Sequence, residues 1–264
     1  MKKKILMISG SPRKKGDGAK VLNHLASVLT ENSDIECESL FLTDYSLEAC
    51  RGCLVCQKKA GDNCPVKDDL GIIKEKMAEA DGLVFMSPVY IRMISAQMKM
   101  LFDRLSFYLH RPVHAGKPAL ILCTSSYAGI KESLNYMKIP VGNMGMRIVD
   151  SKGVLSSAYK LNSEYKNRVH DHLNKTGKKI TDDLLSEGKP RPSVKELFIF
   201  NKWKHKAMYH KKYYPGDFQF WEEKGWFDKD FYYPVRINPV LKLLIPFMVK
   251  KVMRRLSQKI GYLQ

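Results

Sequence analysis

Four cysteines lie within fifteen residues and are the most concentrated group of reactive side chains in the sequence. Cys50, Cys53, Cys56 and Cys64 have the spacing C-x2-C-x2-C-x7-C, and Pro65 follows the last of them. Thiolates two residues apart can bind neighbouring irons, so one loop of this kind can wrap a cubane iron–sulfur cluster. Four thiolates also suit tetrahedral zinc, although zinc sites usually consist of two separated pairs. The third interpretation is that the thiols stay free and the loop serves subunit contacts.

A second group of polar and basic residues follows the first apolar segment of the chain. Residues 9–18 read SGSPRKKGDG. Glycines let backbone N–H groups approach an anion, a helix N-terminus adds a favourable dipole, and Arg13 can donate charge-assisted hydrogen bonds. The segment is neither a Walker loop nor a dinucleotide fingerprint, since both glycine patterns are absent. It therefore predicts either a phosphate-binding loop or an ordinary glycine-rich turn.

The elements that position these residues alternate regularly over the first 155 residues. Such alternation predicts right-handed βαβ units and a doubly wound, five-stranded parallel sheet of the α/β class. Ligands of such sheets bind outside the carboxyl ends of the strands, where the strand order reverses. Strands are predicted at residues 4–9, 35–40, 82–86, 118–123 and 147–154, and helices at 19–29, 68–80, 96–108 and 130–136.

Two further loops are expected at this edge, SPVY at 87–90 and TSSYAG at 124–129. Pro88 stiffens the first loop, and its exposed amides can hydrogen-bond the polar edge of a flat ring. Tyr90 offers an apolar face for stacking, or alternatively caps the core.

Four ordered motifs resemble the NADPH-dependent FMN reductase family, and particularly its iron–sulfur flavoprotein branch, over about residues 3–155. The motifs are GSPRK at 10–14, the cysteine run followed by two aspartates, SPVY at 87–90, and K-x-x-F-D-R at 99–104. The resemblance implies a flavodoxin-like fold, FMN as cofactor, NAD(P)H as reductant, and a dimer or tetramer. One departure is that the family often has Asn and then Ser or Thr where this chain has Asp17 and Gly18, so a hydroxyl donor is lost and a negative charge lies near the phosphate.

The same resemblance implies three groups of FMN-binding residues, and no catalytic side chain is assigned because the flavin supplies the chemistry. It also implies a [4Fe-4S] cluster on Cys50, Cys53, Cys56 and Cys64, with zinc and free thiols as the alternatives. The FMN groups are Ser9, Ser11, Pro12, Arg13, Lys15 and Gly18 around the phosphate, Pro88, Val89 and Tyr90 along the ring, and Ser125, Ser126, Tyr127 and Gly129 at its other edge.

Other polar residues are expected to be structural. Asp103 and Arg104 predict an ion pair on a helix surface that fixes packing or a subunit contact. His110 and His114 flank Pro112 in a loop and have no convincing ligand partner. Solvated or structural roles are predicted for these histidines.

The C-terminal part of the chain differs in kind from the rest. A polar helix at 163–187 precedes GKPRP at 188–192, which divides the chain into a flavodoxin-like domain, 1–187, and an extension, 188–264. Residues 198–233 contain 14 of the 27 aromatic residues, and residues 161–264 contain 22 Lys and Arg against 11 Asp and Glu, within a net charge of +18. We expect this aromatic segment to pack over the flavin.

The extension ends in a predicted amphipathic helix. Ile245, Val249, Val252 and Leu256 form an apolar stripe, and the other side is basic. We expect the stripe to dock on its own domain or on a partner subunit. A peripheral position on an anionic membrane is the weaker alternative.

The function predicted from these features is that of an FMN-dependent NAD(P)H oxidoreductase. It would pass electrons to a quinone, a nitro or azo compound, or an iron–sulfur cluster. The alternative is an iron–sulfur flavoprotein that relays electrons without oxidising NAD(P)H itself. A nucleic-acid-binding module is a weaker third hypothesis, because basic and aromatic residues interleave but no such motif is present. The crowded cysteines and the lack of a secretory signal predict a reducing, cytoplasmic location.

Overall fold

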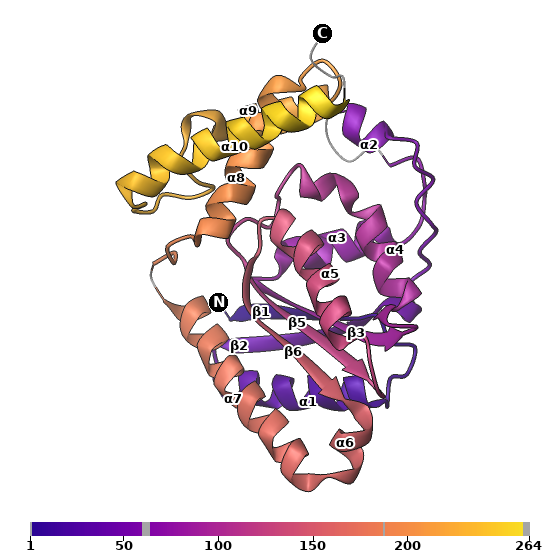
Figure 1. The fold of residues 1–264 in the computed structure, drawn as a ribbon. Coiled ribbons are helices and arrows are strands. Elements are labelled where there is room, and N and C mark those ends of the chain that lie inside the picture. The colour runs from indigo at the N-terminus through magenta and orange to yellow at the C-terminus, as the bar shows by residue number, and fades with distance from the viewer. Residues whose placement is uncertain (1, 60–63, 187, 261–264) are drawn as a thin grey trace.

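Five parallel strands in the order β2-β1-β3-β5-β6 form the centre of the molecule (Figure 1). The computed structural model describes residues 2–59, 64–186 and 188–260. This strand order is that of flavodoxin-like sheets, in which the order reverses between β1 and β3. The predicted fold class is therefore confirmed. The parallel strands are β1 (Lys3–Ser9), β2 (Ile35–Phe41), β3 (Gly82–Tyr90), β5 (Pro118–Ser125) and β6 (Arg147–Leu155).

The predicted number of strands needs a correction, because the sheet has six. The sixth, β4 (Met93–Ile94), pairs antiparallel with the end of β3. Two residues are too short to show a periodic pattern in the sequence. The pairing also extends β3 to Tyr90, so Pro88 and Val89 belong to a strand where a loop was predicted.

Alternate residues of the strands fill two cores on opposite faces of the sheet, because successive side chains of a β-strand point to opposite sides. Leu6 and Ile8 of β1 face one core, whereas Ile5 and Met7 face the other. Every residue of β5 is buried, as expected of a strand covered on both faces. One face is covered by α3 (Leu70–Glu79), α4 (Ala96–Arg104) and α5 (Ile130–Asn143), and the other by α1 (Asp17–Thr30), α6 (Ser156–Leu161) and α7 (Ser163–Leu185).

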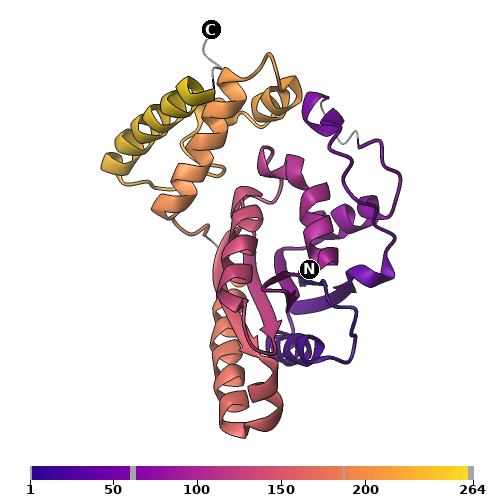
Figure 2. The same cartoon turned by 45° about the vertical axis from the view of Figure 1, so that its right-hand side comes forward.

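The C-terminal helices build a third core of their own, beside the main sheet in both views (Figures 1 and 2). Ser193 begins the first helix with a capping box that includes Glu196. Phe200 and Trp221 are fully buried at the centre of this core. The helices of this core are α8 (Val194–Tyr209), α9 (Pro215–Glu223) and α10 (Pro239–Ile260), with the short helix η3 (Trp226–Asp228) between the last two. The remaining short helices of the chain are η1 (Leu42–Asp44), α2 (Val55–Lys58) and η2 (Ser106–Leu109).

The aromatic segment does not cover the carboxyl edge of the sheet, contrary to the expectation from sequence. Trp203 donates a hydrogen bond to Asn143 at the end of α5, and Trp221 donates one to the carbonyl of His110. Tyr233 packs on Gly116, just before β5. These contacts lie at the amino ends of β5 and β6, so the edge where ligands bind is left to other residues. Within the described residues, no helix is both long and apolar enough to cross a membrane.

Candidate flavin site and cysteine loop

The carboxyl ends of β1, β3 and β5 lie at one level of the sheet. Ser9 is opposite Met86, and Ser87 is opposite Cys123. Immediately after β1, the amide of Gly10 donates a 2.8 Å hydrogen bond to the Met86 carbonyl. The three predicted loops therefore start side by side at the point where the strand order reverses.

The loop between β1 and α1 has the features of a phosphate cradle. Ser9 and Ser11 are buried; the Ser9 hydroxyl accepts from the Ser11 amide at 3.3 Å, and the Ser11 hydroxyl accepts from the Arg13 amide at 3.1 Å. Neither hydroxyl donates to an acceptor within the described part of the chain, so both protons are available to a ligand. Gly16 begins α1 without a capping side chain, which leaves the first-turn amides to an anion. Pro12, Arg13 and Lys15 are exposed above this cradle.

Asp17, the residue that departs from the family pattern, has its charge compensated. Its carboxylate lies 3.2 Å from the ammonium of Lys160 on α6 and 3.9 Å from that of Lys20. The side chain is mostly buried beneath these lysines. The negative charge is therefore held in ion pairs at the start of α1, and it does not face a phosphate alone.

Gly18 places the start of α1 directly over the neighbouring strands. A Cβ at this position would lie 3.6 Å from Met86 and 3.7 Å from Thr124, which is ordinary contact. The hydroxyl of Ser157 on α6 also donates to the carbonyl of Ser126 at 3.2 Å. The start of α1 therefore lies beside the end of β5, and α6 is bonded to the loop that follows β5.

The hairpin between β3 and β4 presents apolar side chains to solvent. Tyr90 is half exposed and Ile91 is 98% exposed. Ile91 and Arg92 both have positive φ, 47° and 64°, which is unfavourable for a β-branched residue. Beneath the turn, buried Ser87 accepts from the amide of Ser95 at 2.9 Å and fixes the base of the hairpin. The structure therefore holds a strained, apolar tip beside the predicted ring position.

The loop after β5 holds that tip in place. Gly129 has a φ of 86°, and any Cβ there would clash with the Cα of Arg92. Arg92 also forms an ion pair with Glu132 on α5. Within the loop, the buried Ser125 hydroxyl donates to the Ala128 carbonyl at 2.6 Å and leaves Tyr127 91% exposed.

These side chains fit FMN in two respects. The phosphate end has buried hydroxyls and cations, and the ring end has the exposed apolar surfaces of Tyr90, Ile91 and Tyr127. A planar aromatic ring is bound by such surfaces through stacking and apolar contact. Sequence reasoning missed Ile91 and Ser95, because neither residue type indicates a ligand by itself.

The four cysteines share one neighbourhood but do not form a closed ligand set. Cys50 and Cys53 are exposed, and Cys56 and Cys64 are half-buried. Burial raises the pKa of the Cys56 thiol, and the other three thiols raise this pKa further. Within the described residues, which omit 60–63 of this loop, no three Cys, His, Asp or Glu side chains are placed to hold a metal ion. The donor chemistry fits a metal or cluster; the described arrangement is not a finished site.

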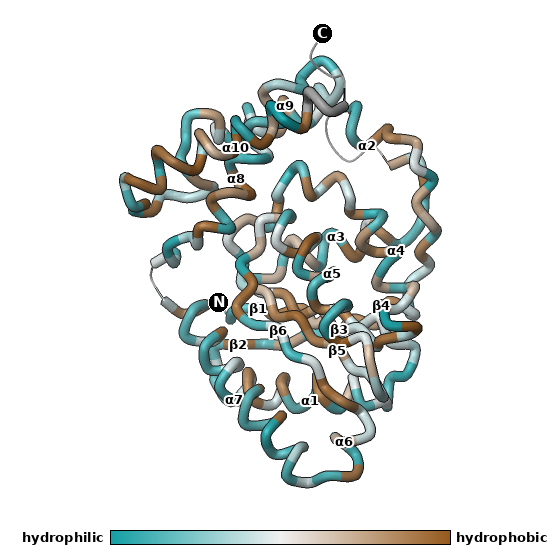
Figure 3. The backbone as a smooth tube through the Cα atoms, in the orientation of Figure 1, coloured by the Kyte–Doolittle hydropathy of each residue, from teal (hydrophilic) through white to brown (hydrophobic). Residues whose placement is uncertain are grey.

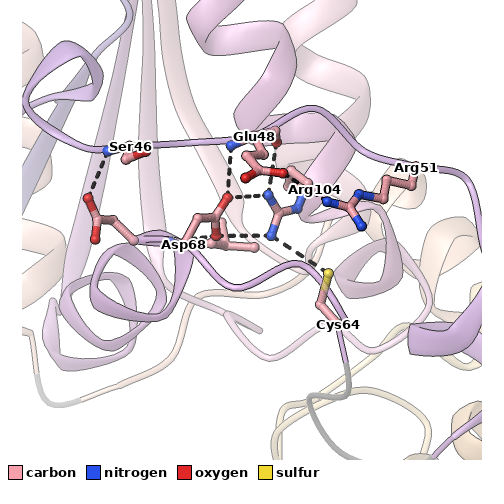
Figure 4. Close-up of polar contacts among 8 residues, drawn as sticks. Ser46, Glu48, Arg51, Cys64, Asp68 and Arg104 are labelled. Carbon is pink, nitrogen blue, oxygen red and sulfur yellow. Dashed lines mark hydrogen bonds and ion pairs between the residues drawn. The ribbon is translucent and has the colours of Figure 1, made fainter.

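Arg104 ties the cysteine loop to the domain (Figure 4). Its guanidinium forms an ion pair with Asp68, donates to the Glu48 carbonyl at 2.8 Å, and points one nitrogen at the Cys64 sulfur, 3.6 Å away. The predicted surface pair of Asp103 with Arg104 is therefore wrong. Asp103 pairs with Lys99 one turn earlier on α4, while Arg104 is buried.

Asp68 is held as a carboxylate by several donors. Burial alone would raise its pKa, but hydrogen bonds from Arg104 and from the amides of Glu48 and Leu70 outweigh that effect and lower the pKa. The ion pair is therefore present throughout the neutral range. It fixes both ends of the described cysteine loop, since Glu48 precedes the cysteines and Asp68 follows them.

Helix α4 connects the flavin edge with the cysteine loop. The hydroxyl of Ser95, its N-cap, accepts from Met98 and lies 3.4 Å from the Ser87 hydroxyl, whereas Arg104 at its other end reaches Cys64. A helix of nine residues is about 13 Å long. The two candidate sites therefore lie at opposite ends of one short helix.

A second buried arginine joins the cysteine loop to the extension. Arg111 donates to the carboxylate of Asp217 on α9 at 2.8 Å and to the carbonyl of Lys59 at 3.1 Å. His110 shares the same carboxylate at 2.9 Å. Gly216 packs so closely on Lys59 that a Cβ would clash with its carbonyl. The structural role predicted for His110 agrees with these contacts, but the sequence did not indicate its partner.

Residues 3–160 match the family of NADPH-dependent FMN reductases. An iron–sulfur flavoprotein of Archaeoglobus fulgidus is 29% identical over 230 residues, which cover 84% of this chain and 99% of that protein. An iron–sulfur flavoprotein of Methanocaldococcus jannaschii is 40% identical over 113 residues, 43% of this chain and 54% of that protein.

Solved structures agree with the fold. A flavone reductase superposes with a TM-score of 0.56 at 17% identity, covering 72% of this chain and 66% of that one. An NADH:FMN oxidoreductase in its apo form gives a TM-score of 0.51 at 22% identity, covering 73% and 98%. The family match spans more than half of the chain and includes the loops described above. The chain therefore belongs to the NADPH-dependent FMN reductase family and is a flavoprotein oxidoreductase.

Proposed function

We propose that the protein binds FMN at the carboxyl edge of its sheet, oxidises NAD(P)H and reduces a second acceptor. The acceptor would be a quinone, a nitro or azo compound, or an iron–sulfur cluster. Bound FMN supplies hydride and electron transfer, and the side chains bind it, orient it and shield it. The observation that carries this proposal is the convergence of three loops at one level of the sheet, with buried hydroxyls at one end and an apolar rim at the other.

The residues have separate roles in this proposal. The hydroxyls of Ser9 and Ser11 donate to the phosphate, and Arg13 and Lys15 neutralise its charge. Pro12 and Gly18 shape the loop, and Pro88, Val89 and Tyr90 line the ring. The other edge of the ring is bordered by Ser125, Ser126, Tyr127 and Gly129.

Steady-state oxidation of NADH and NADPH by the FMN-loaded protein tests the proposal. A quinone, a nitro compound and an azo dye are each assayed separately as the electron acceptor. We expect nicotinamide oxidation that depends on FMN and on one of these acceptors. FMN-loaded protein that oxidises neither nicotinamide would contradict the proposal and favour the relay described next.

The second candidate is an electron relay between flavin and a cluster, and α4 is the observation that favours it. One short helix carries Ser95 beside the flavin edge and Arg104 beside Cys64. We propose that Cys50, Cys53, Cys56 and Cys64 are the ligands of this cluster. A donor such as Arg104 near a ligand sulfur is the kind of contact that tunes cluster potentials.

Anaerobic reconstitution with iron and sulfide tests this ligand set. The chain should take up about four irons, as a cubane cluster requires. Cys53→Ser should lower the iron content sharply, whereas Cys37→Ser, on β2 outside the loop, should not. Uptake of zinc alone, or equal iron in both variants, would contradict the cluster.

We further propose two structural units, residues 1–187 and 188–264, that work within a homo-oligomer. The separate third core of the extension supports the division. Light scattering of the purified protein would report the subunit number.

A further inference from the structure

Helix α10 buries one side in the extension and presents a second side to solvent. Ile245 and Val249 are buried in the third core, which accounts for half of the stripe predicted from sequence. The opposite side carries Val240, Leu243 and Phe247, which follow each other at steps of three and four. Leu243 is 76% exposed and Phe247 66% exposed. These apolar residues are therefore not used by the fold.

The same side continues as a basic surface. Lys250, Lys251 and Arg254 follow Phe247 at helical spacing, and all are exposed. None of them forms an ion pair with a described residue, and α10 contains no Asp or Glu. We define the outward face of α10 by these six residues: Val240, Leu243, Phe247, Lys250, Lys251 and Arg254.

The position of α10 makes this face accessible. Both views place the helix at the outer margin of the molecule, with α8 beneath it (Figures 1 and 2). Figure 3 colours much of its first half hydrophobic. The outward face is therefore the exposed side of a peripheral helix, apolar over its first turns and basic over the next.

We propose that the outward face of α10 binds an anionic membrane surface, with the helix lying in the headgroup plane. Large apolar side chains beside lysine and arginine are the composition of helices that bind in this way, since apolar burial and attraction to anionic lipids act together. A second copy of this chain fits less well. In a two-fold interface the same surface meets itself, so the lysine and arginine side chains of both copies would lie in one interface with no acidic residue in either α10 to compensate them.

Sedimentation of the full-length protein with vesicles tests the proposal, which is independent of the proposed reductase activity. We expect binding to phosphatidylcholine vesicles that contain phosphatidylglycerol, little binding to phosphatidylcholine alone, and loss of binding as salt rises. The double variant L243S/F247S should bind roughly 10-fold more weakly or worse, because each replacement removes apolar burial. K251E/R254E should bind at least roughly 30-fold more weakly, because attraction is lost at two positions and each glutamate adds repulsion.

A matched control is K178E/K179E on α7, which changes two exposed lysines elsewhere and should reduce binding much less. FMN content and circular dichroism report that each variant is folded. Three results would overturn the proposal: wild-type protein that ignores anionic vesicles at low salt, α10 variants that bind like wild type, or α10 variants that alter only the oligomeric state. Binding to soluble polyglutamate that is as strong as binding to anionic vesicles, and that persists in L243S/F247S, would also overturn it. The face would then recognise an acidic polypeptide.

Discussion

Replacing Asp217 with asparagine removes the carboxylate that Arg111 and His110 share. Arg111 is 3% exposed and Asp217 is 2% exposed, so water cannot solvate the guanidinium once the charge is lost. His110 offers no replacement, because an imidazole is either neutral or positively charged and cannot neutralise a guanidinium. The variant therefore removes the carboxylate that Arg111 contacts, while the guanidinium stays buried.

The size of the effect follows from the contacts that remain. Removing one partner of a buried ion pair typically costs about 3–5 kcal/mol. Arg111 keeps its hydrogen bonds to the carbonyls of Gln57 and Lys59, and the asparagine oxygen can still accept one bond. We therefore expect a loss at the lower end, about 3 kcal/mol in the free energy of unfolding.

Urea denaturation followed by tryptophan fluorescence measures this loss. All three tryptophans of the chain lie in the extension, so the signal reports the unit that contains Asp217. The midpoint should fall without a change in slope. Glu222→Gln, on the exposed side of α9, is the matched control and should change stability by less than about 0.5 kcal/mol.

Alkylation of the thiols gives a second readout of the same change. Because Arg111 anchors the backbone after Cys56, Asp217→Asn should speed the reaction of Cys56 with iodoacetamide. A stability change below about 1 kcal/mol would show that the Arg111–Asp217 pair does not hold the loop to the extension.

Three further predictions concern the domain itself. Arg13→Ala should weaken FMN binding by about 1.5–3 kcal/mol while riboflavin affinity hardly changes, as measured by fluorescence titration; equal losses would place Arg13 away from the phosphate. Because the pKa of Asp68 is lowered in the folded state, its contribution to stability is present above the unfolded pKa of about 3.9 and is lost as the pH falls through the folded pKa. The free energy of unfolding, measured as the pH is lowered, should show this loss in wild type but not in Asp68→Asn. Identical pH profiles of the two proteins would contradict the ion pair with Arg104. Gly129→Ala should lower stability by about 1–3 kcal/mol in urea, because its φ of 86° and the nearby Arg92 backbone oppose a Cβ; wild-type stability would mean that the turn can move freely.

The fold could be predicted because its signals are local and repeated. Apolar segments of strand length alternate with helical periodicity, and each of the five parallel strands occurs where the pattern placed it. Strand β4 could not be found in this way. Its turn at Ile91 and Arg92 has positive φ without glycine or asparagine, so the usual hairpin signal is missing.

The site was partly predictable for the same reason. Residues after parallel strands must meet at the carboxyl edge, and in the structure Gly18 lies beside Met86 at the end of β3 and Thr124 at the end of β5. The partner of Arg104 was not predictable. Adjacent residues on a helix do not face each other, and its true partner, Asp68, lies 36 residues earlier in the chain.

The extension shows the limit of periodicity most clearly. The pattern identified an amphipathic helix and the residues Ile245 and Val249 that it buries. Periodicity does not indicate which surface an aromatic segment covers, because that depends on contacts such as Trp203 with Asn143. The segment accordingly lies at the amino ends of the strands, away from the predicted flavin.

The absorption spectrum of protein purified without oxygen tests most directly whether FMN is bound at the carboxyl edge of the sheet. We predict two resolved flavin bands with one FMN per chain, and a large decrease of both bands in Arg13→Ala purified in parallel. A broad absorption shoulder that turns the protein brown would indicate that an iron–sulfur cluster is also bound. Colourless protein that does not take up added FMN, or flavin content unchanged in Arg13→Ala, would contradict the site described for the β1–α1 loop.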